Sequence, residues 1–154
     1  MTGGRAEAAE IDAALANDNT ATGAQSAALA RAAIPTADAK LAAWSSLIDV
    51  DTAATTIVRT TAAGFLRVND STLLAPFTAK YFDMLQSVWD ARSFSIGEKL
   101  VIGLYPSPLN SRALADATHA WLDANAEPAA LRRLVVENLA GVERSLAVQA
   151  RDAR

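Results

Sequence analysis

The sequence predicts an all-α protein, and three observations lead to this prediction. Hydrophobic residues make up 51% of the 154 residues, whereas glycine and proline number only seven and five. Alanine supplies much of the hydrophobic share, and alanine loses no side-chain entropy in a helix. Apolar residues recur at spacings of three and four, and no alternating run of strand length interrupts them. A chain of this length suits one domain with a substantial core.

The first two helices are predicted over residues 6–16 and 21–33. Between them the letters NDNTATG supply Asn, Asp, Thr and Gly, which favour turns and helix caps. The second helix should end before Pro35, because a residue that precedes proline is disfavoured in the helical region. The joint is short, so the two helices are expected to be antiparallel.

A third helix is predicted over the segment ADAKLAAWSSLI, with Thr36 as its N-cap. Leu41, Trp44 and Ile48 recur at three and four, so they are expected to share one buried face. The fourth segment, AATTIVRTTAAGF, would be capped by Asp51 or Thr52. Its clustered threonines favour a helix less strongly.

The longest amphipathic stretch is predicted over residues 72–91, introduced by Ser71. Its apolar side chains follow the spacing three, four, four, three, which gives one continuous stripe and places this helix deep in the core. The stripe consists of Leu74, Phe77, Tyr81, Leu85 and Val88.

Two helices are predicted between residues 95 and 125. Ser95 is expected to open the short helix IGEKLVIGLY, which ends at Pro106. Asn110 or Ser111 would cap the next one, RALADATHAWLDAN. Gly97 and Gly103 lie within the first of these helices, and we attribute them to close helix packing.

The last segment begins with Pro128, which is tolerated in the first turn of a helix. It forms one long helix or breaks near Gly141, because glycine costs about 1 kcal/mol relative to alanine. The total is about eight antiparallel helices. Their lengths and short joints predict hairpins stacked in a superhelical array like those of HEAT or armadillo proteins, although no strict sequence period is present.

Charge and composition exclude several classes of protein. The net charge is −3 and the isoelectric point is about 5.1, which argues against a nucleic acid partner. The chain has no cysteine, so disulfides and thiolate metal sites are excluded. No run reaches the roughly 18 apolar residues of a membrane span, and the first ten residues lack the apolar core of a signal peptide. We therefore expect no membrane contact and a cytoplasmic location.

His119 is the only histidine, and it is the first residue to consider for chemistry. With about 100° per residue, Trp121 falls on the buried side of its helix as a core anchor, and His119 points to the polar side. Asp116, His119 and Asp123 stand at i, i+3 and i+7, a spacing compatible with a metal site. One histidine without cysteine is unusual for zinc, so we favour a solvated charged face and expect no metal ligand in this chain.

Catalytic signatures are missing from the sequence. There is no G-x-S-x-G, P-loop or G-x-G-x-x-G motif, and one histidine cannot complete H-E-x-x-H. We therefore assign no catalytic or cofactor-binding residue. The final segment is basic, and its positive charge complements the helix dipole. Alternatively, Arg132 and Arg133 bind a carboxylate of a peptide or of a neighbouring domain.

Five blocks in the same order carry a resemblance to a known family. They read ALANDNTATG, ARAAIPTADAKLAAW, LLAPFTAKYFDML followed by VW, LVIGLYPSPL, and AWLDANAEPAALRRLVVENLAGVERSLAVQARDA. Together they resemble the carboxy-terminal end of actinobacterial aminopeptidase N, a family of zinc-dependent aminopeptidases. The RVNDST turn and the ENLAG stretch depart from the pattern expected at those places.

The resemblance implies a non-catalytic domain. Residues 6–154 would be an aminopeptidase N-like C-terminal helical domain, and residues 1–5 a disordered or artificially introduced start. The domain would cover and shape the peptide chamber of an enzyme that removes N-terminal residues, with the catalytic domain of the same polypeptide and a peptide substrate as partners. Zinc and the catalytic residues belong to earlier domains, so the isolated chain should be inactive. The alternative is a free-standing helical-repeat scaffold that binds a protein or peptide in its concave groove.

Overall fold

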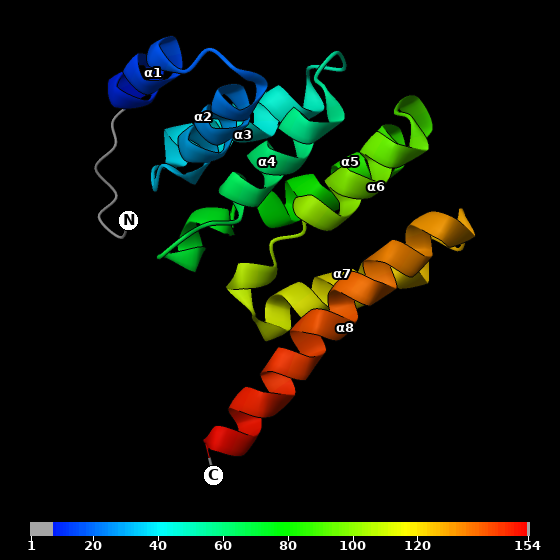
Figure 1. Ribbon diagram of the computed structural model, residues 1–154. Coiled ribbons are helices and arrows are strands. Elements are labelled where there is room, and N and C mark those ends of the chain that lie inside the picture. The colour runs from blue at the N-terminus through cyan, green and yellow to red at the C-terminus, as the bar shows by residue number, and fades with distance from the viewer. Residues whose placement is uncertain (1–7, 154) are drawn as a thin grey trace. The chain divides into compact units, whose positions relative to one another are not determined.

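A computed structural model describes residues 8–153, which form eight α-helices and two short 3₁₀ helices and contain no β-strand (Figure 1). The all-α prediction is therefore confirmed, while the superhelical array stays a prediction. The expectation for residues 1–5 falls outside the described residues. Two compact units are present, residues 8–73 and residues 74–153. Each is described by itself.

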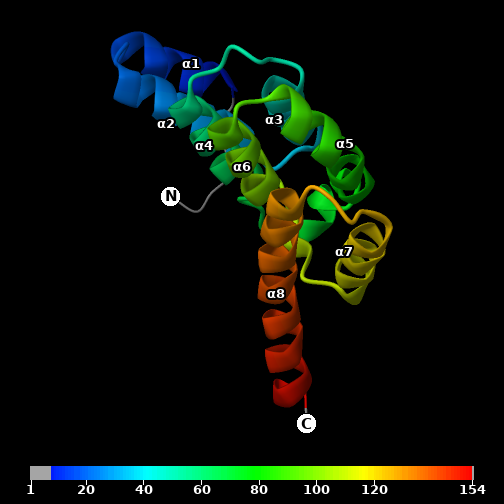
Figure 2. The same cartoon turned by 90° about the vertical axis from the view of Figure 1, so that its right-hand side faces the viewer.

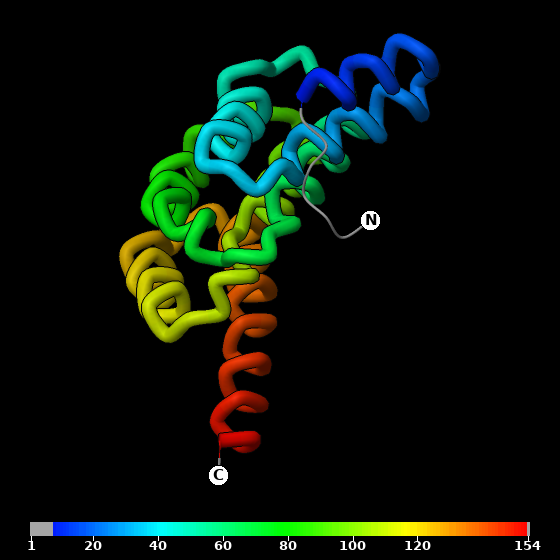
Figure 3. The backbone as a smooth tube through the Cα atoms, turned by 90° about the vertical axis from the view of Figure 1, so that its left-hand side faces the viewer, coloured from blue at the N-terminus to red at the C-terminus, as the bar shows by residue number. Residues whose placement is uncertain are grey.

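The first unit contains four helices: α1 (Ala8–Asn17), α2 (Ala21–Ala33), α3 (Ala37–Ile48) and α4 (Thr55–Phe65). As predicted, α1 and α2 lie side by side and run in opposite directions (Figure 3). The Thr20 hydroxyl accepts a hydrogen bond from Gly23 N at 3.0 Å and so caps α2. The Thr36 hydroxyl accepts one from Ala39 N at 3.2 Å, which confirms it as the cap of α3.

Helix α4 packs on both α2 and α3, and its approach to α2 is close. A Cβ atom added to Gly64 would lie 2.3 Å from the Leu29 carbonyl oxygen. Only glycine therefore fits at this point. The start of α4 differs from the prediction, because Ala54 occupies the N-cap and no side chain caps the helix. Asp51 and Thr52 are too far upstream to do so.

The buried face of α3 is displaced by one residue from the predicted one. Leu41 is 48% exposed, whereas Lys40, Ala43, Trp44 and Leu47 are buried. One residue corresponds to about 100° of rotation about the helix axis. Lys40 therefore points into the core, where Leu41 was expected. The Trp44 ring lies 5.9 Å from the Phe65 ring of α4, which fixes this orientation of α3.

The second unit contains α5 (Phe77–Ala91), α6 (Phe94–Gly103), a 3₁₀ helix η2 (Ser107–Leu109), α7 (Arg112–Ala124) and α8 (Ala129–Asp152). The predicted stripe on α5 is confirmed, since all five of its residues are buried. The predicted start at residue 72 is wrong. Residues Ser71–Leu74 form a separate 3₁₀ helix, η1, and α5 begins after Pro76. Proline disfavours the helical conformation of the residue before it, which interrupts the stretch.

Serine hydroxyls cap the next two helices of this unit. Ser93, two residues before the predicted Ser95, accepts a hydrogen bond from Ile96 N at 3.4 Å and begins α6. Ser111 accepts one from Leu114 N at 3.2 Å and begins α7. Asn110 adopts the left-handed conformation instead, with φ of 42°.

Helix α8 is unbroken through its 24 residues, and the predicted alternative of a break near Gly141 is wrong. A single glycine costs about 1 kcal/mol, which the packing of the preceding turns outweighs. The buried residues of α8 end at Val142. Its last turns extend beyond α7, and none of its described residues after Val142 is buried (Figure 2).

Candidate functional site

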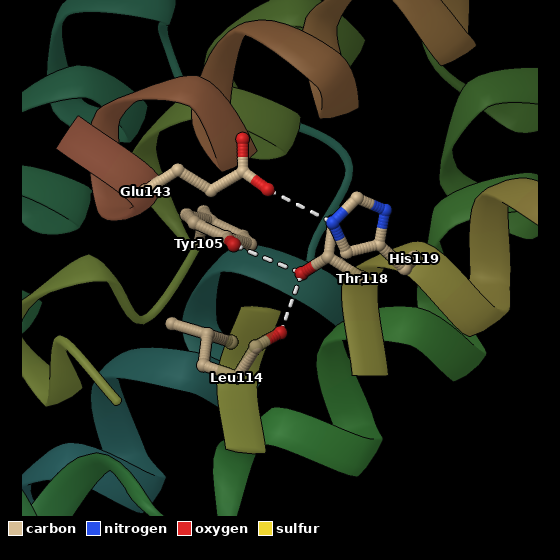
Figure 4. Close-up of polar contacts among 5 residues, drawn as sticks. All are labelled: Tyr105, Leu114, Thr118, His119 and Glu143. Carbon is tan, nitrogen blue, oxygen red and sulfur yellow. Dashed lines mark hydrogen bonds and ion pairs between the residues drawn. The ribbon is translucent and has the colours of Figure 1, made fainter. Parts of the chain in front are cut away.

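The side chain of His119 projects from α7 toward α8, where it meets Glu143 (Figure 4). His119 Nε2 lies 2.9 Å from Glu143 Oε1, and the two side chains are 55% and 48% exposed. An exposed pair of this kind contributes little to stability. Glu143 was not predicted as its partner, since the two residues are 24 positions apart in the sequence.

The described residues do not fit a zinc site. No three histidine, cysteine, aspartate or glutamate side chains between residues 8 and 153 come together to hold a metal ion. Asp116 and Asp123 therefore do not form a ligand set with His119. The carboxylate that His119 contacts is that of Glu143 on α8, and not those of Asp116 and Asp123 on α7.

Two buried hydroxyl groups lie behind the His119–Glu143 pair. The Thr118 hydroxyl donates to the Leu114 carbonyl oxygen at 2.7 Å, so the Tyr105 hydroxyl, 2.9 Å away, donates to Thr118 (Figure 4). Burial raises the pKa of Tyr105, so its phenol stays neutral. These bonds join α7 to the segment that follows α6, and they satisfy groups that would otherwise be buried without partners.

A second buried network joins α5, α6 and α8. The Tyr81 hydroxyl donates to the Val101 carbonyl oxygen at 2.7 Å, and the Asn138 amide donates to that oxygen at 3.0 Å and to the Tyr81 hydroxyl at 3.3 Å. Burial also raises the pKa of Tyr81. The Tyr81 and Tyr105 rings meet edge to face, with centroids 5.3 Å apart. Both networks consist of uncharged groups, and they join the helices of the second unit to one another.

The two arginines that the sequence singled out have different surroundings. Arg132 Nη1 donates to the Leu122 and Asn125 carbonyl oxygens, where α7 ends. A cation at this place complements the negative end of the α7 dipole. Arg133 is 66% exposed, and its Nε lies 3.9 Å from Glu137 Oε1 on the same helix. Arg133 is thus the more accessible of the two, and their predicted role in binding stays a prediction.

Trp121 is half-buried, so the prediction that it anchors the core is wrong. Leu122, the next residue, is buried at 9% exposure and points into the unit instead. Gly97 also differs from the prediction. A Cβ atom there would meet the Trp89 ring at 3.6 Å, an ordinary contact, so this position does not require glycine.

Sequence reasoning missed Lys40, which is fully buried in the first unit. Its Nζ donates to three carbonyl oxygens: Ala32 at 2.6 Å, Gly64 at 3.1 Å and Arg67 at 3.1 Å. These acceptors lie at the C-terminal ends of α2 and α4, where the helix dipoles favour a cation. Burial lowers the pKa of Lys40 from 10.5 to about 8. A signal was available, because Lys40 is the one charged residue in the stripe it forms with Ala43, Trp44 and Leu47.

No helix within residues 8–153 is both long enough and apolar enough to span a membrane. The predicted cytoplasmic location stays a prediction.

Comparisons with known proteins relate the sequence to a family of domains. A family model described as "ERAP1-like C-terminal domain" matches residues 1–144. The chain is also 44% identical over 151 residues to a protein named aminopeptidase N from Streptomyces lividans. The match covers 97% of this chain but 18% of that relative, so the chain spans less than a fifth of the relative's length.

Proposed function

The chain belongs to the ERAP1-like C-terminal domain family, and on this premise we propose that it is the non-catalytic C-terminal domain, residues 6–154, of a zinc-dependent aminopeptidase. One observation carries the proposal: nearly the whole chain matches a small part of an aminopeptidase N at 44% identity. The parent enzyme would remove N-terminal residues from peptides. This domain would cover and shape the chamber in which the peptide binds.

The proposal assigns the chemistry to another part of the same polypeptide. The zinc ion and the residues that activate water would belong to a catalytic domain, because residues 8–153 bring no set of metal ligands together. This domain would contribute a helical surface to the chamber, stacked in the predicted superhelical array. Within it, Arg133 is the better placed of the two arginines to meet a peptide or domain carboxylate, because its guanidinium is exposed and Arg132 is occupied by α7.

A domain exchange tests the proposal. The segment of the Streptomyces lividans relative that matches this chain is deleted in one variant and replaced by this chain in another. We expect the deletion to lose hydrolysis of leucine p-nitroanilide and the exchange to restore it. An exchanged enzyme that folds, binds zinc and still lacks activity would contradict the proposal and favour an independent scaffold.

The isolated chain provides the complementary measurement. It should not hydrolyse alanine or leucine p-nitroanilide at any zinc concentration. Turnover that a chelator abolishes would place catalysis within these residues and end the proposal. The intact Streptomyces lividans relative, assayed in the same buffer, serves as the positive control.

A further inference from the structure

The first unit contains a pocket with a volume of about 420 Å³, lined by residues of α2, α3 and α4, by Ile34 after α2 and by Ala8 at the start of α1. Its floor is made of the buried residues Ala32, Ala43 and Thr61. The exposed side chains of Arg31 and Ser46 stand at its rim. The volume lies in the range of about 300 to 1,000 Å³ that is usual for small-molecule sites.

The walls of the pocket are almost entirely hydrocarbon. Most of the lining residues are alanines, and alanine leaves space that a larger core side chain would fill. Of the described residues that line the pocket, only Arg31 carries a charge. Its guanidinium pairs with the Asp12 carboxylate of α1, so the charge at the rim is already compensated.

Specific contacts hold together three of the helices around the pocket, α2, α3 and α4. From α3, the Lys40 ammonium group binds the Ala32 carbonyl of α2 and the Gly64 carbonyl of α4. The close approach of Gly64 to the Leu29 carbonyl sets the distance between α2 and α4. These contacts tie α2, α3 and α4 to one another without any ligand.

We propose that this pocket binds an uncharged, mainly hydrocarbon small molecule of about the size of two fused rings. The pocket opens to solvent on one side, and its volume exceeds the roughly 150 Å³ of an enclosed apolar cavity that holds benzene, so it accommodates a larger apolar group. A charged ligand would lose its hydration against the hydrocarbon walls, and Arg31 is already paired with Asp12, so an uncharged molecule is favoured. This site is separate from the proposed aminopeptidase role and does not depend on it.

The test uses a matched pair of fluorescent probes with the full chain. N-phenyl-1-naphthylamine is uncharged, and 8-anilinonaphthalene-1-sulfonate has the same rings with a sulfonate. We expect saturable binding of the neutral probe with one site per chain, at least about tenfold tighter than that of the sulfonate. Equal affinity for the two probes would overturn the assignment of an uncharged ligand.

Filling the pocket identifies where the probe binds. Ala43→Leu places a larger side chain on the floor, and Ala39→Leu places one on the wall as a second variant should the first fail to fold. Each should weaken neutral-probe binding about tenfold or more. Ala63→Leu, on the exposed side of α4, is the control and should leave binding unchanged.

Circular dichroism melting confirms that each variant is folded before its titration is interpreted. Unchanged binding in a folded pocket-filling variant would refute the proposal. An absence of saturable binding to the unmodified chain, or an equal loss in Ala63→Leu, would refute it as well. Loss confined to the two pocket-filling variants is the result that supports it.

Discussion

The two units hold their helices together with different kinds of polar group. In the first unit one ammonium group, that of Lys40, binds three carbonyl oxygens, one in α2, one in α4 and that of Arg67 after the end of α4. In the second, neutral hydroxyl and amide groups of Tyr81, Asn138, Tyr105 and Thr118 share the same task over several weaker bonds. In the first unit the polar contribution to stability therefore comes from one charged side chain, and it depends on pH. The neutral arrangement spreads its contribution over four side chains.

Replacing the ammonium group should produce the largest effect. Lys40→Met keeps the length of the side chain but leaves the three carbonyl oxygens without this donor, so we expect a loss of about 3 kcal/mol in the free energy of unfolding. Trp44 is the tryptophan of the first unit. Its fluorescence during urea unfolding, measured with the other two tryptophans changed to phenylalanine, reports this loss. A loss below 0.5 kcal/mol, on the order of a surface substitution, would show that the carbonyls find other partners.

Alkaline titration should separate the two units. The folded-state pKa of Lys40, about 8, lies below the ordinary 10.5, so between these values the unfolded chain binds more protons than the folded chain. The first unit should therefore gain about 2 to 3 kcal/mol of stability as the pH rises from 8 to 10. The difference in unfolding free energy between the unmodified chain and Lys40→Met, measured across this range, isolates the effect. A difference that does not change with pH would contradict the lowered pKa.

The second unit should lose stability as the pH rises above about 10, because of its two buried tyrosines. Burial raises the pKa values of Tyr81 and Tyr105, so their contribution to stability is present below about pH 10 and is lost as the pH rises above it. Both phenols are present in the unmodified chain and in Lys40→Met, so the difference between these two chains removes their contribution from the Lys40 titration.

A pair of glycine substitutions compares the packing of the two units. Gly64→Ala places a methyl group against the Leu29 carbonyl and should destabilise the first unit by about 2 kcal/mol. Gly141→Ala meets no atom within 4 Å and should stabilise α8 by up to about 1 kcal/mol. Thermal melting followed by circular dichroism measures both changes. A Gly64→Ala chain as stable as the unmodified one would show that the approach of α2 and α4 is looser than described.

The smallest effect is expected in the neutral network. Tyr81→Phe removes one hydroxyl group, but the Asn138 amide still donates to the Val101 carbonyl oxygen, so no carbonyl is left without a donor. We expect a loss of about 1 kcal/mol in the free energy of unfolding, measured by urea titration. A loss as large as that of Lys40→Met would show that the second unit depends on one hydroxyl group as strongly as the first unit depends on the Lys40 ammonium group.

Much of the helix pattern was predictable because its signals are local. Thr36 and Ser111 cap the helices that follow them, and Pro35 follows the end of α2, as short-range rules require. The stripe from Leu74 to Val88 was also correct, since large apolar side chains at helical spacing must be buried together. Pro76 was overlooked as an interruption, and the predicted helix was therefore too long at its start.

The candidate site was less predictable because its contacts join distant parts of the sequence. The partner of His119 lies on another helix, and helical spacing within α7 suggested only Asp116 and Asp123. Lys40 was not singled out, because a lysine is buried only where acceptors from elsewhere surround its nitrogen. Those acceptors are backbone carbonyls of α2, α4 and the residue Arg67, and no side-chain pattern marks a carbonyl.

The turns of α8 beyond Val142 are a helix without a buried face of their own. An isolated helix of about ten residues is marginal in water because its nucleus is costly, whereas adding residues to an existing helix is not. The packed turns from Ala129 to Val142 supply that nucleus. The exposed turns continue the backbone hydrogen bonds of the packed turns. Unwinding of α8 should therefore begin at its C-terminal end and stop near Val142, where the buried residues start.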